Sequence, residues 1–245
     1  MGHNIRRPSS IEFPFIAGII RRNRDFITER DTVCTASLIT DKNILTAEHC
    51  LTNEVVNGLI IIVGSNDLES PSRYYPAWWI SFNQWSKLPS SRTTIYSNDI
   101  AVINLSTIIR DRIPYGILSF LSYRELRNKD VVTVGWGEIN NGSFPRLLHA
   151  VNLKVLTKTD CALRARALSG ENFKINENLI CTVGDPFALL MRGDSGGPLL
   201  YKNKIVGINT GTGPLPQQSF HPDKINVHCN LKHYNDFLLN IISYM

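Results

Sequence analysis

A serine between glycines is the residue of this chain best suited to covalent chemistry. It lies in Gly193–Pro198, which reads GDSGGP. Gly193 and Gly196 carry no side chain, so a substrate backbone could approach the serine closely. The N–H groups of Gly193 and Ser195 could then stabilise a carbonyl oxygen as it becomes an anion. The run could equally be a glycine-rich turn, so the chemistry depends on a histidine and a carboxylate elsewhere.

A histidine and an aspartate in two further segments could activate this serine. His49 lies in TAEHC (46–50), just after the run NIL (43–45), and Asp99 directly precedes the strand-like run Ile100–Leu105. A serine hydroxyl is a poor nucleophile until a base takes its proton, and imidazole titrates close to neutral pH. An aspartate before a strand could also be a simple turn residue. We interpret the other five histidines as surface or hydrogen-bonded core residues.

In the order His49, Asp99, Ser195, these segments resemble the chymotrypsin/trypsin-like serine peptidases (peptidase S1), of the invertebrate type. The resemblance runs from about Phe13 to the C-terminal end. Further matching segments are FPF (13–15), VGSNDL (63–68), GWG (135–137), CNL (229–231) and YNDFL (234–238). The resemblance implies that Ser195 is the nucleophile, His49 its base and Asp99 the residue that orients His49, while the Gly193 and Ser195 amides hold the oxyanion.

The family implies an all-β fold of two six-stranded antiparallel β-barrels packed together, followed by a C-terminal helix. Short apolar stretches separated by turn residues agree with this architecture. We expect one peptidase domain over 1–245, with the first barrel at about 13–110, the second at about 122–230 and the helix at about 231–243. His49 and Asp99 would come from the first barrel and Ser195 from the second. Apolar residues recur at helical spacing through 231–242.

Five cysteines leave one over after pairing. The resemblance implies the disulfides Cys34–Cys50 and Cys161–Cys181, with Cys229 remaining, and it implies secretion into an oxidising compartment. Met191 stands where a cysteine usually braces the substrate pocket. Residues 1–7 carry charge but no apolar segment follows, so no secretory signal is visible. No apolar run approaches the ~18 residues of a membrane span.

The residues expected at the substrate pocket depart from the family pattern. Leu189, six residues before the serine, would form the floor, with Leu190 beside it. Thr212 and Asn226 would stand at wall positions where glycines usually leave room, and Thr210 at the position whose hydroxyl usually contacts the triad acid. An apolar floor with filled walls predicts cleavage after apolar or small residues.

Two acidic residues near the site raise separate questions. The resemblance implies that Asp194 pairs with an N-terminal ammonium created by cleavage, but no IVGG segment is present, and Ile5 is the nearest isoleucine to the expected start. A buried carboxylate without a partner is costly. Glu48 replaces a small residue beside the histidine. It could raise the pKa of His49 or point to solvent, and we expect solvent.

The remaining signals are weaker. The net charge is +5 and the sequence pI about 9.0, which favours solubility over a nucleic-acid partner. Arg21, Arg22, Arg24 and Arg30 are expected in a solvated loop. No cluster has metal-ligand spacing, so we expect neither metal nor cofactor, and a calcium loop around Glu69 is not favoured. Asn141 and Asn104 begin sequons. We expect only Asn141 to be glycosylated, because Asn104 lies on a strand.

The sequence therefore predicts a secreted, monomeric serine endopeptidase that acts through an acyl-enzyme on proteins or peptides and is bound by protein protease inhibitors. The alternative is a non-catalytic homologue with a binding or regulatory role. It is motivated by the absent N-terminal motif, the Leu189 floor, the filled walls and the missing pocket disulfide. The complete set of His49, Asp99 and Ser195 favours the enzyme.

Overall fold

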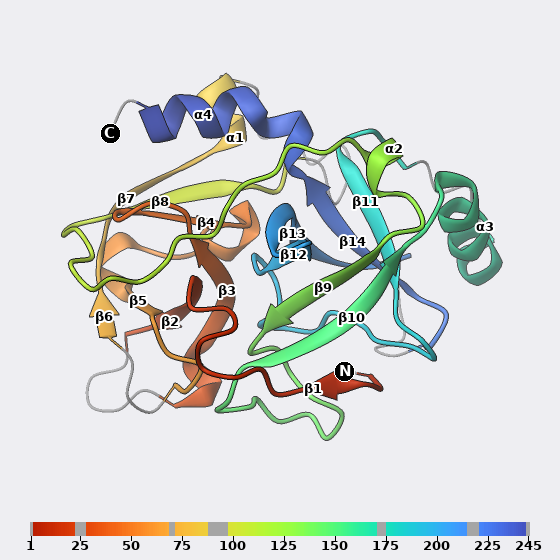
Figure 1. Cartoon of the computed structure of the whole chain (residues 1–245), viewed down its shortest axis with the longest axis horizontal. Helices are drawn as coiled ribbons and strands as arrows, with labels where there is room; N and C mark the ends of the chain where they lie inside the picture. The colour runs from red at the N-terminus through yellow and green to blue at the C-terminus, as the bar shows by residue number, and fades with distance from the viewer. Residues whose placement is uncertain are drawn as a thin grey trace.

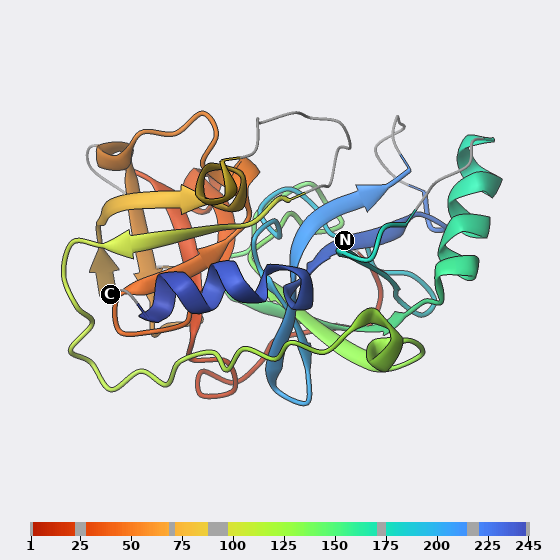
Figure 2. The same ribbon diagram turned by 90° about the horizontal axis from the view of Figure 1, so that it is seen from above.

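The computed structural model describes residues 2–22, 28–68, 72–87, 98–170, 175–214 and 221–243. Two antiparallel sheets lie side by side (Figures 1 and 2). Few helices accompany them. The predicted all-β fold of two barrel-like units with a C-terminal helix is confirmed.

The first sheet has seven strands in the order β6-β5-β2-β3-β4-β8-β7. They are β2 (Ile16–Arg21), β3 (Thr32–Leu38), β4 (Asn43–Thr46), β5 (Leu59–Val63), β6 (Ser72–Tyr74), β7 (Pro76–Ser81) and β8 (Ala101–Leu105). The edge strands β6 and β7 follow one another along the chain, and β7 begins at a proline, which has no N–H to donate to a ladder. No ladder joins the two edges in the described residues. This unit is therefore a half-barrel and not the closed six-stranded barrel we expected.

The second sheet closes into the expected barrel of six strands. Its strands are β1 (Ile5–Arg6), β9 (Asp130–Gly135), β10 (His149–Val155), β11 (Leu179–Val183), β12 (Pro198–Tyr201), β13 (Lys204–Gly213) and β14 (Ile225–Asn230). The order is β1-β10-β11-β14-β13-β12-β9, and an additional β9–β10 pairing closes the ring. Strand β1 pairs with β10, so the first strand of the chain belongs to the second sheet.

The α-helices are short and lie outside the sheets. They are α1 (Phe82–Ser86), α2 (Tyr123–Leu126), α3 (Lys158–Ser169) and α4 (Asn235–Ser243), with 3-10 turns at η1 (Glu29–Asp31), η2 (Glu48–Cys50), η3 (Val56–Gly58) and η4 (Leu231–Tyr234). Helix α4 thus begins four residues later than predicted, after η4. Its residues Phe237, Leu238 and Ile241 join the core of the first sheet, so α4 ties the two units together (Figure 2).

Helix α3 was not predicted, although its ends carry clear signals. Thr157 caps the N-terminus by accepting a hydrogen bond from Asp160 N–H, and Gly170 ends the helix in the left-handed conformation. Only Cys161 and Ala165 of this helix are buried. It therefore lacks the apolar face by which a helix is predicted from its sequence. The helix lies at the edge of the second unit (Figure 2).

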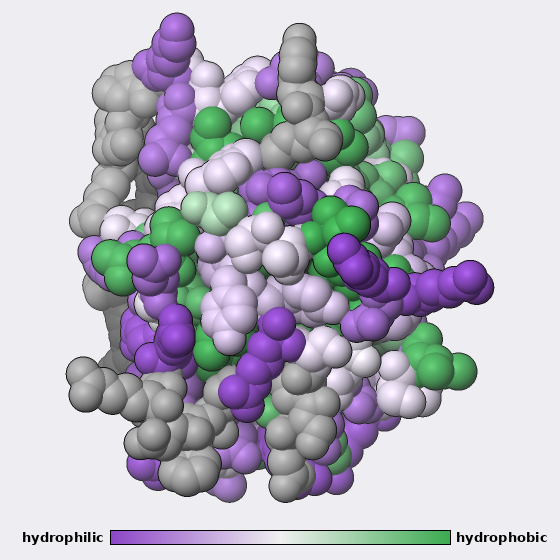
Figure 3. Space-filling view, turned by 90° about the vertical axis from the view of Figure 1, so that its left-hand side faces the viewer, coloured by the Kyte–Doolittle hydropathy of each residue, from purple (hydrophilic) through white to green (hydrophobic). Residues whose placement is uncertain are grey.

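One apolar core runs across the interface between the sheets. Strand β5 is buried at every position, and Val134, Trp136 and Ile208 of the second sheet pack into the same cluster. The face beyond the first sheet mixes hydrophilic and hydrophobic side chains (Figure 3). Among the described residues, no helix is long and apolar enough to cross a membrane. Residues 106–122 connect the sheets, and the predicted domain boundaries stay a prediction.

Candidate active site

The structure brings His49 and Asp99 together. Nδ1 of His49 lies 2.7 Å from Oδ2 of Asp99, and the His49 backbone N–H donates to Oδ1 at 2.9 Å. The His49 side chain is 46% exposed and that of Asp99 only 11%. Burial of the ring disfavours its charged form, but the hydrogen bond and the charge of Asp99 outweigh this and raise the pKa of His49. The pair has the geometry of a base and its orienting carboxylate.

Asp99 is held from the second sheet and from η4. Cys229 Sγ lies 3.5 Å from the Asp99 carbonyl oxygen, and the Tyr234 hydroxyl donates to Oδ1 of neighbouring Asn98 at 3.4 Å. Thr210 behaves differently from the expectation that its hydroxyl would reach the triad acid. The hydroxyl donates to Val227 O of the partner strand β14 at 2.7 Å.

The Ser195 loop packs directly against the segment that carries His49. The backbone N–H of Thr35 donates to Ser195 O at 3.0 Å. Gly196 has a φ of +76°, and a Cβ at this position would overlap Thr46 Oγ1. Both the positive φ and the close approach require glycine. The serine loop thus lies against residues only three positions before the histidine.

The N–H groups of Gly193 and Ser195 have no acceptor within the described residues, whereas those of Asp194, Gly196 and Gly197 all donate to carbonyl groups. Gly193 has a φ of +97°, and its carbonyl accepts a hydrogen bond from the Thr35 hydroxyl at 2.8 Å. These two amides are therefore available to a substrate oxygen. The described residues include no hydrogen bond from the Ser195 hydroxyl to His49, and such bonds are often long without substrate.

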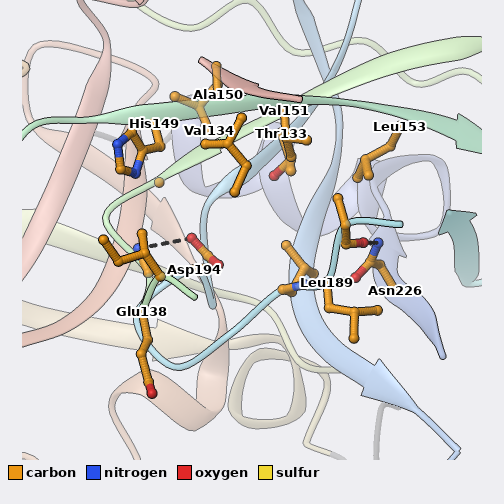
Figure 4. A pocket seen from close by; sticks show the side chains of 16 residues that line it. Thr133, Val134, Glu138, His149, Ala150, Val151, Leu153, Leu189, Asp194 and Asn226 are labelled. Atoms are coloured by element: carbon orange, nitrogen blue, oxygen red, sulfur yellow. Dashed lines mark hydrogen bonds between the residues drawn. The ribbon is translucent and has the colours of Figure 1, made fainter. Parts of the chain in front are cut away.

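The Asp194 carboxylate points inward and accepts two backbone hydrogen bonds. Gly137 N–H donates to Oδ1 and Met191 N–H to Oδ2, each at 2.9 Å. Burial raises the pKa of Asp194, and the two donors oppose this effect. A cavity of about 40 Å³ borders the carboxylate and also touches Leu189 and Asn226 (Figure 4). The buried acid is therefore part of the same region as the predicted pocket.

Residues 2–4 brace the segment just before Leu189. Gly2 is buried and pairs with Ala188, its N–H donates to Asn140 Oδ1 at 2.8 Å, and His3 N–H donates to Phe187 O at 3.0 Å. A Cβ on Gly2 would lie 2.6 Å from Ala188 Cα. The small residue at position 2 is required by this close contact.

The structure also brings together the predicted pocket residues Leu189, Thr212 and Asn226. Leu189 is 5% exposed and Asn226 fully buried, and Thr212 lies opposite Asn226 in the β13–β14 pairing. The Asn226 side chain accepts from Leu190 N–H and donates to Ala188 O, both at 2.8 Å. Its polar groups thus bond to the floor segment itself. Asn226 thus ties Ala188 and Leu190, the residues on either side of Leu189, to strand β14.

The two expected disulfides are present, Cys34–Cys50 and Cys161–Cys181. The first joins β3 to η2 and so fixes the turn that carries His49, whose Nε2 lies 4.0 Å from Cys50 Sγ. Cys229 belongs to neither disulfide, and burial raises the pKa of its thiol. Cys34, His49 and Cys50 are the one group of potential metal ligands among the described residues. Both sulfurs are already bonded to each other, so the group does not fit a metal.

Glu48 is not directed to solvent as we expected. It is half-buried, and its Oε2 accepts a hydrogen bond from Asn83 Nδ2 of α1 at 2.7 Å. Burial raises the pKa of its carboxyl group. Arg21, Arg22 and Arg30 are exposed, and Arg21 pairs with Glu54 at 2.6 Å. Arg24 and Glu69 lie outside the described residues, and Asn141 lies exposed in a turn.

Asn209 and His228 are residues near the site that sequence reasoning missed. Asn209 contacts the Ser195 loop and His228 contacts Asn209. A polar residue between apolar strand neighbours in the run VGINTG (206–211) was the one available signal. Asparagine and histidine are common in strands without any role in chemistry, so that signal was not specific.

Comparisons with known proteins identify the family of the chain. The family model Trypsin matches residues 3–238. The chain is 28% identical over 203 residues to venom serine protease 34 of Apis mellifera, which covers 78% of this chain and 46% of that protein. It is 30% identical over 227 residues to the clotting factor G beta subunit of Tachypleus tridentatus, covering 85% of this chain and 69% of that protein. The chain thus spans about half the length of the first of these relatives.

Solved structures show the same fold. Neuropsin, a serine protease of mouse brain, has a TM-score of 0.77 and 23% identity, with 98% of this chain and 99% of that chain covered. The scabies mite inactivated protease paralogue S-D1 also has a TM-score of 0.77, with 18% identity and coverage of 97% and 96%. Because the family model covers nearly the whole chain and the fold agrees, the chain belongs to the trypsin family of chymotrypsin-like serine proteases.

Proposed function

We propose that this protein is a serine endopeptidase that hydrolyses peptide bonds through an acyl-enzyme. The observation that carries the proposal is the His49–Asp99 pair, with 2.7 Å between Nδ1 and Oδ2, beside a serine loop whose Gly193 and Ser195 amides lack a protein acceptor among the described residues. A base, an orienting acid and a pair of oxyanion donors are the groups that acyl transfer requires.

In the proposed reaction, Ser195 Oγ attacks the carbonyl carbon of the scissile peptide bond, and His49 Nε2 takes the hydroxyl proton. The carbonyl oxygen becomes an oxyanion that the Gly193 and Ser195 N–H groups stabilise. His49 then gives the proton to the leaving amine as the C–N bond breaks. A water molecule repeats the sequence on the ester and releases the acid. Asp99 orients His49 and stabilises the positive charge that forms on it.

The expected preference is for apolar or small residues on the N-terminal side of the cleaved bond. Leu189 provides no charge to attract an arginine or lysine, and Asn226 reduces the room behind it. Dominant cleavage after arginine or lysine would contradict this part of the proposal.

The cellular setting is proposed from the chemistry of the chain. Two disulfides fit secretion into an oxidising compartment, and the names of two matched relatives are those of venom proteases. Asn141 would carry a glycan in that setting. Serine proteases act on protein or peptide substrates and are bound by protease inhibitors, and we expect the same partners here. We also expect a monomer that does not bind nucleic acid.

A non-catalytic binding role is the second candidate, because Asn226 occupies the pocket region with both of its polar groups satisfied. One solved structure with this fold is named an inactivated protease paralogue. A protein of this kind would keep the fold and bind partners without turnover.

A panel of peptides that vary at the residue before the scissile bond separates the two candidates. The enzyme predicts turnover that disappears in Ser195→Ala, while both proteins keep the same melting temperature. Equal background hydrolysis by the wild type and by Ser195→Ala would favour the binding protein.

A further inference from the structure

Asn209 of β13 contacts the Ser195 loop at three points. Its Nδ2 donates to Asp194 O at 3.0 Å, its backbone N–H donates to Gly197 O at 2.8 Å, and its carbonyl accepts from Gly196 N–H at 2.8 Å. The side-chain contact is distinct from the strand hydrogen bonds, because it fixes the carbonyl group on the N-terminal side of Ser195. One residue thus holds both flanks of the proposed nucleophile.

A chain of side chains stands behind this contact. Asn209 Nδ2 also lies 2.8 Å from Thr133 Oγ1, and the Thr133 hydroxyl lies 3.1 Å from Pro198 O. Asn209 Oδ1 lies 2.9 Å from His228 Nδ1, and His228 Nε2 lies 2.8 Å from Thr182 Oγ1. The network therefore joins four strands of the closed barrel to the loop.

These distances fix the hydrogens on Asn209 and His228. Since Asp194 O can only accept, Asn209 Nδ2 donates to it, and Asn209 Oδ1 must then accept from His228 Nδ1–H. His228 Nε2 is left without a hydrogen and accepts from the Thr182 hydroxyl. Thr133 Oγ1 accepts from Asn209 Nδ2, and its hydroxyl has two acceptors at 3.1 Å, Pro198 O and Asn209 Oδ1. Every side-chain donor and acceptor along the line has a partner, which is the condition under which a buried polar network stabilises one conformation.

The network is closed to water. Thr182, Asn209 and His228 are fully buried and Thr133 is 5% exposed. Burial lowers the pKa of His228 to about 3, so the ring is neutral near neutral pH. The hydrogen assignment requires a neutral ring. The other side of the loop is held by Thr35, whose hydroxyl donates to Gly193 O at 2.8 Å. The loop is thus clamped by a side chain from each sheet.

We propose that Asn209, oriented by His228, is a positioning residue that fixes the 194–195 peptide and thereby directs the Ser195 N–H and hydroxyl toward the substrate. The Asp194 carbonyl and the Ser195 N–H belong to the same peptide plane, so a hydrogen bond to one sets the direction of the other. The expected effect on catalysis rests on the proposed peptidase function. The fixing of the 194–195 peptide by Asn209 does not depend on it.

The catalytic part is tested with Asn209→Leu, which keeps the shape and removes the amide, and with the matched control Asn104→Leu. Asn104 is also a buried strand asparagine, bonded to Asn43 Oδ1 at 3.0 Å in the first sheet. A misdirected reacting group lowers the reaction rate on the order of 100-fold, so kcat of Asn209→Leu should fall by about that factor. KM should change less than about threefold, because substrate binding does not depend on this group. Asn104→Leu should lose stability without a change in kcat of the folded protein.

Rescue at His228 separates positioning from simple packing. The amide of glutamine presents a donor and an acceptor with roughly the spacing of the two ring nitrogens, so His228→Gln should keep most of kcat and His228→Leu should lose about tenfold. Equal kcat values for wild type, Asn209→Leu and His228→Leu in folded proteins would overturn the catalytic part.

Amide hydrogen exchange decides the structural part even if the wild type proves inactive. Residues 193–197 should exchange about tenfold faster in Asn209→Leu than in wild type, and Asn104→Leu should leave them unchanged. Equal exchange in all three proteins would overturn the proposal. Absence of turnover in wild type together with faster exchange in Asn209→Leu would refute the peptidase function and keep the network.

Discussion

The His49–Asp99 pair and the Leu189–Asn226 region differ in how they meet solvent. The His49 side chain is 46% exposed and one of its ring nitrogens is bonded, which leaves Nε2 to accept a proton. Asn226 is fully buried and both ends of its amide bond to the 188–190 segment. The proposed base is thus open to solvent, whereas Asn226, a residue of the predicted pocket, is enclosed by the protein. Under the proposed function we therefore expect that reaction and selectivity can be changed separately.

Asp99→Asn should cause the largest loss of activity, because it removes the carboxylate that orients the proposed base His49. The amide that replaces the carboxylate can donate to His49 Nδ1, which favours the tautomer with its hydrogen on Nε2, and this tautomer cannot act as the base. The corresponding change in this family costs about 10⁴-fold in kcat. Hydrolysis of a good peptide substrate measures this loss. The residue preference of the remaining activity should be unchanged, and a change in preference would show that the two regions are coupled.

Gly137→Ala should disturb the buried acid that borders both regions. A Cβ at Gly137 would overlap the Asp194 carboxylate, so the free energy of unfolding should fall by about 3 kcal/mol. Thermal or urea unfolding measures the change. Gly142→Ala in the exposed turn is the control: nothing lies closer than 3.5 Å to its added Cβ, so its cost comes from the φ of +76° alone and should be about 1–2 kcal/mol. It should cost less, and equal losses would contradict the close contact at Asp194.

Asn226→Ala should change which residue is preferred before the cleaved bond and leave the His49–Asp99 pair intact. Removing the amide opens room behind Leu189, so kcat/KM for substrates with a large apolar residue before the cleaved bond should rise about tenfold. Asn178→Ala removes another buried asparagine, which is bonded to the Tyr234 hydroxyl and not to the floor segment. This control should keep the wild-type preference. A preference that stays the same in Asn226→Ala would remove this residue from the specificity region.

The smallest expected effect is that of Glu48→Gln on the pH dependence of kcat/KM. The Asp99 partner raises the pKa of His49 above 6.5, so kcat/KM should fall as the pH drops through an apparent pKa above that value. The same shift stabilises the fold below pH 6.5, and this stabilisation disappears as the pH rises through the folded-state pKa. Because the Glu48 carboxylate is held by Asn83, Glu48→Gln should move the apparent pKa by less than about 0.3 units. A larger shift would mean that Glu48 acts on His49 directly.

The fold was predictable from the sequence because its motifs mark strand ends and tight turns, and each needs a particular residue. Gly196 illustrates this, since its positive φ and its contact with Thr46 leave no other choice. Helix α3 was missed because it lacks an apolar face, and its capping residues are common in loops. The open edge of the first sheet depends on which strands pair, since no ladder joins β6 to β7 in the described residues, and alternation of apolar residues does not reveal the pairing.

The environment of the candidate site was predictable only in part. His49 and Asp99 were paired correctly in space because their motifs lie on adjacent segments of one sheet. The hydroxyl of Thr210 and the carboxylate of Glu48 found other partners, Val227 O and Asn83, because local distances decide which acceptor or donor is used. Asn209 and His228 also contact Thr133 and Thr182, which lie 76 and 46 residues away in the sequence, and no local pattern encodes such contacts.

Covalent labelling with a fluorophosphonate probe tests the central claim most directly. The probe reports an activated serine and does not depend on the unknown substrate. Mass spectrometry of the labelled wild-type protein should place the adduct on Ser195, with no adduct in Ser195→Ala and a much slower reaction in His49→Ala. A folded wild-type protein that stays unlabelled, or an adduct on any other residue, would contradict the peptidase account.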